Sequence, residues 1–279
     1  MRNAEHYPDP TAGQALRAVI KYPGAKWRLA DWIIKHMPRH KSYLEPYFGS
    51  GAVFFRKPPS RIETINDIDD NIYNLFCCIR DNADKLARLV AQTPYSRREY
   101  ETTFTAGDVE RFEQARRYLV KCWQGHGFRI TCKSGWKNDI NGRERAYAVR
   151  CWQQLPDWIM QIVARLKQAQ IEHMPAVELI QRFNRPDVLV YADPPYLLQT
   201  RKLKKQYAHE MSEKDHTELL EVLQQNKGPV LLSGYDSELY NNMLADWDRV
   251  QIRTTAEKGL HRTEVLWIKG NSNDLRLFD

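Results

Sequence analysis

The sequence lacks any uninterrupted apolar run long enough to span a membrane, and the mean hydropathy of the 279-residue chain is −0.65. This absence excludes a transmembrane helix on sequence grounds. The first twenty residues include two prolines and have no apolar core of the kind that secretory signals carry. We therefore expect a soluble, cytoplasmic protein with no membrane partner.

Cysteine is scarce, and its spacing suits neither zinc binding nor redox chemistry. The chain has five cysteines, an odd number, and no two of them form a CxxC pair. We expect free thiols and no metal site. The length and an apolar fraction of 42% allow one large domain or two modest ones. The cysteines are Cys77, Cys78, Cys122, Cys132 and Cys151.

The positive charge is concentrated in one segment. Residues 116–150 carry nine lysines and arginines against two acids, a net charge of +7 that equals that of the whole chain. Aromatic and glycine residues alternate with these cations, which is typical of surfaces that bind nucleic acid. The alternative is an ordinary solvated face. The residues that we expect to bind DNA are Arg116, Arg117, Lys121, Arg129, Lys133, Lys137, Arg143 and Arg145.

Short β-like runs alternate with helical patterns, which predicts an α/β fold with a mainly parallel sheet. We expect strands at 42–47, 62–66, 188–192, 230–233 and 264–268, and helices at 27–36, 71–82, 84–92, 110–123 and 148–169. A capping box at Ser212–Asp215 predicts the start of a further helix. Residues 85–170 break the alternation, so we expect an inserted domain there, with residues 1–84 and 171–279 forming the other domain.

Two motifs follow the first two predicted strands. In Leu44–Gly51, LEPYFGSG, two glycines allow positive φ and a close approach of the backbone to a ligand, although a purely structural turn would look the same. Asp67 comes roughly twenty residues later, at the end of the next strand, where this type of fold uses an acid to bind a ribose. The alternative for Asp67 is a helix N-cap, which Asp69 or Asp70 could also supply.

The most informative motif is DPPY, residues 193–196, directly after an apolar strand. An amino group on an aromatic ring needs acceptors for its two N–H bonds and a face on which the ring can stack. A carboxylate, a backbone carbonyl held by rigid prolines and a tyrosine offer all three. A proline-rich turn is the alternative. Near the N-terminus, KYPGAK at 21–26 would by itself be only a basic turn.

Together these motifs resemble the Dam-like, DPPY-type adenine-N6 DNA methyltransferases, which use S-adenosylmethionine. KYPGAK, LEPYFGSG, NDID and DPPY occur in that family's order, with a target-recognition segment before DPPY. The resemblance implies a Rossmann-like class I methyltransferase sheet with a mostly helical, basic insert. It implies cofactor-binding roles for Tyr22, Lys26, Phe48, Gly49, Ser50, Gly51, Asp67, Ile68 and Asp193, and catalytic roles for Asp193, Pro194, Pro195 and Tyr196.

The resemblance also implies the reaction, a site-specific methyl transfer to N6 of an adenine flipped out of duplex DNA. It places the protein in a bacterial or phage-infected cell and allows a cognate restriction endonuclease as a partner. Residues 207–219 are also similar to the stretch that follows DPPY in relatives. The resemblance does not predict the recognition sequence or the oligomeric state.

Three alternatives remain open on the sequence. An RNA adenine-N6 methyltransferase would share the chemistry, and the aromatic residues of the insert would also suit unpaired bases. A protein-glutamine methyltransferase is less favoured, because that class typically has Asn at the position of Asp193. A catalytically inactive DNA-binding regulator is disfavoured by the intact Gly49, Gly51, Asp67 and Asp193.

Overall fold

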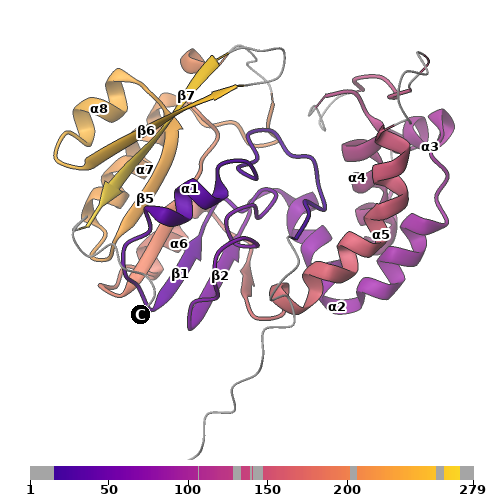
Figure 1. Ribbon diagram of the computed structural model, residues 1–279, viewed down its shortest axis with the longest axis horizontal. Helices are drawn as coiled ribbons and strands as arrows, with labels where there is room; N and C mark the ends of the chain where they lie inside the picture. The colour runs from indigo at the N-terminus through magenta and orange to yellow at the C-terminus, as the bar shows by residue number, and fades with distance from the viewer. Residues whose placement is uncertain are drawn as a thin grey trace, which may run out of the picture.

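The computed structural model describes residues 16–105, 107–127, 133–138, 140, 147–201, 206–255 and 261–270. Its centre is a seven-stranded sheet of order β3-β2-β1-β4-β5-β7-β6, which Figure 1 shows from the side. The five strands from β3 to β5 are parallel, and β7 is antiparallel to both of its neighbours. The strands are β1 (Ser42–Glu45), β2 (Ile62–Asn66), β3 (Gln170–Glu172), β4 (Val188–Ala192), β5 (Val230–Tyr235), β6 (Asp248–Thr255) and β7 (His261–Lys269). The predicted α/β class with a mainly parallel sheet is confirmed.

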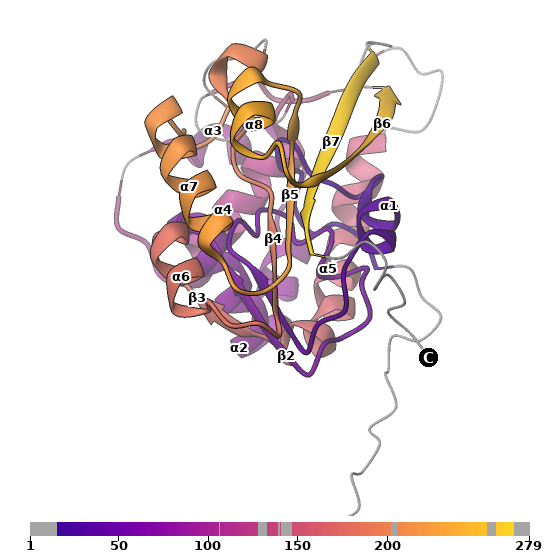
Figure 2. The ribbon, with the colours of Figure 1, turned by 90° about the vertical axis from the view of Figure 1, so that its left-hand side faces the viewer.

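Helices cover both faces of the sheet, because successive residues of each buried strand point to opposite sides. Leu189 and Leu231 enter one apolar core, while their neighbours Val190 and Leu232 enter the other. In Figure 2, α6 and α7 lie on one side of the strands and α1 lies on the other. The helices are α1 (Ala30–Lys35), α2 (Asp70–Ala91), α3 (Arg97–Thr102), α4 (Arg111–Gln124), α5 (Tyr147–Leu166), α6 (Ala176–Arg182), α7 (Glu213–Gln225) and α8 (Glu238–Met243), with a 3₁₀ turn at η1 (Leu198–Thr200).

Helix starts follow the local capping chemistry. Ser212 and Asp215 form the predicted capping box, with their side chains each accepting from the other's backbone N–H. The predicted helices 71–82 and 84–92 are joined in α2, which kinks at Asn82, a residue with φ −155°. The Asn82 side chain accepts from the backbone N–H of Lys85, so it caps the second half of α2 as a helix start would.

The predicted insert corresponds to a group of helices beside the sheet. Figure 1 shows α2 to α5 gathered on the side away from β6 and β7. The predicted boundaries fall inside α2, shortly after its kink, and inside β3. A buried ion pair ties this group to the sheet, because Arg165 of α5 binds Glu63 of β2. The recognition role of the segment stays a prediction.

Two predictions from the sequence concern membrane-spanning helices and the state of the cysteines. No helix in the described part of the chain is long and apolar enough to cross a membrane. Four of the five cysteines are free thiols, as expected, and Cys132 lies outside the described residues.

The strands β3 and β6 were not predicted.

Candidate active site

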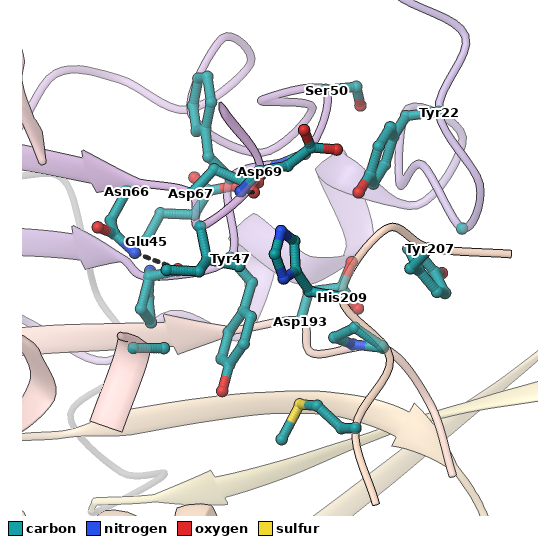
Figure 3. Close-up of a pocket in the computed structure, with 18 of the residues that line it drawn as sticks. Tyr22, Glu45, Tyr47, Ser50, Asn66, Asp67, Asp69, Asp193, Tyr207 and His209 are labelled. Carbon is teal, nitrogen blue, oxygen red and sulfur yellow. Dashed lines mark hydrogen bonds between the residues drawn. The ribbon is translucent and has the colours of Figure 1, made fainter. Parts of the chain in front are cut away.

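The carboxyl ends of β1, β2 and β4 open onto a cavity of about 400 Å³, where an open α/β sheet binds its ligands. Figure 3 shows side chains from these strand ends converging with the N-terminal turn and with residues 207–209. Gly51, Pro194 and Tyr196 are not among the residues that line the cavity. The lining includes the predicted Tyr22, Lys26, Phe48, Gly49, Ser50, Asp67, Ile68, Asp193 and Pro195.

The glycine turn requires both of its glycines. Gly49 and Gly51 have φ of +50° and +65°, a region that L side chains rarely adopt. A Cβ at Gly49 would lie 3.0 Å from the Tyr22 ring, and one at Gly51 would lie 2.4 Å from the Phe48 ring. The turn therefore packs tightly against two of the residues predicted to bind the cofactor.

Asp67 is anchored by backbone donors at the edge of the cavity. Its carboxylate accepts from the N–H of Gly49 at 2.8 Å and from the N–H of Asp69 at 2.9 Å. Burial raises the pKa of Asp67 to about 7, although these two hydrogen bonds lower it. Asp69, and not Asp67, caps α2 by accepting from Asn71. Asp67 is thus free of the helix-capping role that was its alternative.

Asp193 of the DPPY motif forms an ion pair with Lys26. The Lys26 Nζ lies 3.0 Å from Oδ2 of Asp193 and also donates to the carbonyl of Gly24 at 2.6 Å. Burial raises the pKa of Asp193, while Lys26 lowers it. Burial would also lower the pKa of Lys26, but the carboxylates of Asp193 and Glu264 raise it above its ordinary value, so Lys26 stays a cation. The second oxygen of Asp193, Oδ1, is buried and has no hydrogen-bond partner among the described residues.

Tyr196 points toward β5 and β7. Its hydroxyl donates to Oε2 of Glu264 at 2.7 Å, and its ring meets the ring of Tyr235 edge to face with 4.6 Å between centroids. The side chain is 8% exposed. Sequence reasoning did not predict Glu264, whose contact with Tyr196 depends on the pairing of β7 with β5.

Sequence reasoning also missed Glu45, although it quoted the motif that contains this residue. Glu45 ends β1, lines the cavity and accepts from the Tyr43 hydroxyl at 2.7 Å. Burial raises the pKa of Glu45 to about 8. The available signal was an acid at the carboxyl end of a buried strand, which is where ligands bind in this fold.

The segment after DPPY forms another wall of the cavity, in agreement with its similarity to relatives. The Tyr207 hydroxyl donates to the carbonyl of Pro23 at 3.3 Å, and the Tyr207 and Tyr22 rings are 5.8 Å apart. Glu210 fixes this segment by accepting from the N–H of Tyr207 and by pairing with Arg201. In Figure 3 the His209 ring points into the cavity.

The arrangement combines a cavity over a glycine turn with a carboxylate that carries an unsatisfied oxygen. The family model described as D12 class N6 adenine-specific DNA methyltransferase matches residues 22–258. The chain belongs to this family. The resemblance inferred from its motifs is therefore confirmed, together with the reaction, methyl transfer from S-adenosylmethionine to N6 of adenine in DNA.

Individual relatives of the methyltransferase span nearly its whole length. It is similar to a DNA adenine methylase of Haemophilus influenzae, at 27% identity over 91% of this chain and 94% of the relative. It is also similar to the Type II methyltransferase M1.LlaDCHI of Lactococcus lactis subsp. cremoris, at 25% identity over 88% and 90%. A solved SAM-dependent methyltransferase from Agrobacterium tumefaciens aligns with a TM-score of 0.35 and 11% identity, over 87% of this chain and 59% of that one. This score is too low to support the fold, which rests on the strand order.

The predicted DNA-binding residues of the methyltransferase differ in their surroundings. Arg116 is 13% exposed and pairs with Glu99 at 2.9 Å and Glu113 at 2.6 Å, so it is committed to contacts within the protein. Arg117 also pairs with Glu113, and Lys121 is half-buried above the Phe104 ring. The remaining residues are Lys133, which is exposed, Lys137, which is half-buried, and Arg129, Arg143 and Arg145, which lie outside the described residues.

Proposed function

We propose that the methyltransferase acts on an adenine rotated out of duplex DNA, and that Asp193 and the Pro194 carbonyl accept the hydrogens of its N6 amino group. The observation that carries this proposal is the asymmetry of the Asp193 carboxylate. Lys26 holds Oδ2, whereas Oδ1 is a buried acceptor without a donor. Such an atom costs about 1–3 kcal/mol, which an amino group that donates to it would recover. Accepting these hydrogens directs the nitrogen lone pair toward the methyl group.

The residues around the cavity fit S-adenosylmethionine, which supplies an activated methyl group on a sulfonium when it is bound. The Asp67 carboxylate is held by two backbone N–H groups and would accept the ribose hydroxyls. Ile68 is an exposed apolar side chain at the cavity and would pack on the adenine ring. Lys26 would hold Asp193 in place. The further residues that we propose for cofactor binding are Tyr22, Phe48, Gly49, Ser50 and Gly51.

We propose that Tyr196 stacks on the target base and that DNA binding uncovers its ring. Stacking on a base is worth about 1–3 kcal/mol, and it needs an accessible ring face. In the structure, Tyr196 is buried between Glu264 and Tyr235. Pro195, which lines the cavity, would form the floor beside the base.

We propose that residues 85–170 recognise duplex DNA, and that residues 1–84 and 171–279 carry out the methyl transfer. The charge of the segment supports this assignment. Lys133 and Lys137 are suitable phosphate contacts. Lys133 is exposed and its ion pair with Glu101 is long, at 3.8 Å, while Lys137 lies over the Tyr147 ring and has no ion pair among the described residues. We expect Arg117 and Lys121 to contribute less, and Arg116 least.

We further propose that the protein works in the cytoplasm of a bacterial or phage-infected cell, where its DNA substrate is found, and that a cognate restriction endonuclease is a partner. The sequence motif that the enzyme methylates would test the second point. A nuclease from the same cell should cleave unmethylated DNA at that motif and spare methylated DNA.

The reaction is tested by incubating the protein with S-adenosylmethionine and duplex DNA that lacks adenine methylation, followed by mass spectrometry of the digested nucleosides. We expect N6-methyladenine, none with Asp193→Asn, and little with single-stranded RNA as a competing substrate. Methylation of the RNA in preference to the duplex would refute the proposed substrate. Sequencing of the modified DNA would give the recognition sequence.

A further inference from the structure

Glu45 is a buried acid for which the proposed mechanism has no role. It is 2% exposed and ends β1, the strand that pairs in parallel with β4 at Leu44 and Val190. This register brings Glu45 near Asp193, since both follow from the carboxyl ends of neighbouring strands. The Tyr43 hydroxyl donates to Oε2 of Glu45, and Glu45 makes no ion pair with any residue that the structure describes.

Among the residues that the structure describes, the charged groups that face Glu45 do not supply a free cation. Asp193 and Tyr191 face it from β4, and Glu63 faces it from β2. The nearest cation, Lys57, is already bound to Glu63, and Lys26 is bound to Asp193. A buried carboxylate without a cation is unfavourable, so burial raises the pKa of Glu45 to about 8. Burial without a cation therefore favours the protonated form of the Glu45 carboxyl group near neutral pH.

Within the described part of the chain, the lining of the cavity contains more acids than bases. Two of its lining residues are basic, Lys26 and His209, and Lys26 is paired. A positively charged ligand would thus find carboxyl groups that gain by ionising beside it. The acidic lining residues are Glu45, Asp67, Asp69, Glu178, Asp193, Glu210, Asp215 and Glu218.

We propose that Glu45 is the residue that distinguishes the sulfonium cofactor from its uncharged thioether product. A bound sulfonium would favour the ionised form of Glu45, which would release its proton to solvent, so that the charge of the site would be unchanged. With the uncharged thioether bound, the Glu45 carboxylate would take a proton back from solvent. The site then holds the product less tightly. This inference rests on the proposed use of the cavity for the cofactor.

The test is the number of protons released on binding, measured by isothermal titration calorimetry in two buffers of different ionisation enthalpy. S-adenosylmethionine and S-adenosylhomocysteine carry the same amino and carboxyl groups, so their difference isolates the sulfonium. We expect roughly one more proton to be released with S-adenosylmethionine at pH 7. Its affinity should rise about tenfold from pH 6 to 7 and less steeply toward pH 8, while that of the product stays comparatively flat.

Glu45→Gln should remove this difference, because the amide keeps the Tyr43 hydrogen bond but has no proton to release. The two ligands should then show equal proton release and more similar affinities. The matched control is Glu221→Gln, the same change at an exposed residue of α7 that does not line the cavity, which should behave as wild type. A Tyr43→Phe variant provides a second test, because it removes the hydroxyl that donates to the Glu45 carboxylate. This loss should make ionisation of Glu45 less favourable and should therefore weaken the binding of S-adenosylmethionine more than that of S-adenosylhomocysteine.

Two results would overturn the inference. One is a Glu45→Gln variant that still releases the extra proton with S-adenosylmethionine, as wild type does. The other is a loss of the extra proton in Asp193→Asn but not in Glu45→Gln. The failure of the proposed function looks different, because a protein that binds neither ligand gives no heat. A protein that binds both ligands with equal proton release refutes the role of Glu45 but leaves the methyltransferase reaction intact.

Discussion

The two ends of the sheet hold buried acids in opposite surroundings. At the amino end of β2, Glu63 is enclosed by Lys57 and Arg165. At the carboxyl ends of β1 and β4, Glu45 and Asp193 have one bonded cation between them, Lys26. Burial would raise the pKa of Glu63, but its hydrogen bonds and cations lower it, whereas burial raises the pKa of Glu45.

This difference separates a structural site from a binding site. The Glu63 carboxylate accepts from Lys57, Arg165 and the Ser60 N–H, which leaves little for a ligand to add. The Asp193 carboxylate keeps a buried oxygen without a donor. Ionisable groups with shifted pKa values in a cleft are typical of functional sites, whereas saturated ion clusters fix the fold.

The largest effect that we expect comes from Asp193→Ala. Turnover should fall at least about 100-fold, since a positioned charge at the reacting atom is lost. The affinity for DNA should change little, because Asp193 is not part of the basic segment. Single-turnover methylation and DNA-binding titrations would measure the two quantities. Retained turnover would remove Asp193 from the chemistry.

Breaking the opposite cluster should affect stability instead of turnover. Arg165→Met leaves Glu63 with one of its two cations, and breaking a buried pair typically costs about 3–5 kcal/mol. The control is Arg249→Met, which breaks an exposed pair with Asp236 and should cost less than about 1 kcal/mol. Urea unfolding measures both variants. Equal losses would show that the Glu63 cluster is no more important than a surface pair.

The two acids should give the stability opposite pH dependences. Glu45 has a raised pKa, so its contribution is present below its unfolded value near 4.5 and is lost as the pH rises toward about 8. Glu63 has a lowered pKa, so its contribution is present above the unfolded value and is lost as the pH falls through its folded value.

Melting temperatures from pH 4 to 9 without cofactor would test this contrast. Relative to wild type, Glu45→Gln should become more stable as the pH rises from 5 to 8, by at most about 1.4 kcal/mol per pH unit. Glu63→Gln should become more stable relative to wild type as the pH falls below about 4.5, because wild type then loses the contribution of Glu63. Parallel curves for the two variants would contradict the difference between the clusters.

The smallest effect extends the comparison to the basic segment, where the ion pairs of Arg116 are largely buried and that of Lys133 is exposed. A double variant, Lys133→Gln with Lys137→Gln, should have a smaller salt dependence of DNA binding. The slope of log affinity against log salt concentration should decrease in magnitude by about 1.8. Arg116→Gln should leave the slope nearly unchanged and lower the melting temperature, because Arg116 is bound to Glu99 and Glu113. An unchanged slope in the double variant would place the DNA elsewhere.

The sequence predicted those parts of the site that are carried by contiguous motifs. The DPPY residues and the glycine turn each follow a buried strand, so their meeting at one edge of the sheet follows from the α/β pattern. The contact between Tyr196 and Glu264 could not be predicted, because it depends on β7 lying antiparallel beside β5. The ion pairs of Arg116 with Glu99 and Glu113 could not be predicted either, since the sequence shows the charge of Arg116 but not its partners.

The unpredicted strands have a related cause. β3 has three residues, too few for a periodic pattern, and it belongs to the sheet only through its pairing with β2. β6 lies at the sheet edge, where alternation with polar residues weakens the apolar signal. The raised pKa of Glu45 could not be predicted from the sequence, because it depends on Lys57 being bound to Glu63 and Lys26 being bound to Asp193.

The pair of Lys26 and Asp193 also bears on how the enzyme is made. Lys26 leaves the ribosome long before Asp193, and β1 gains its central neighbour only when β4 has been synthesised. A nascent chain that already carries the N-terminal turn and the glycine turn therefore has no assembled catalytic centre. On the proposed mechanism, a chain truncated before β4 lacks Asp193 and the central strand of the sheet, and it should have no methyltransferase activity.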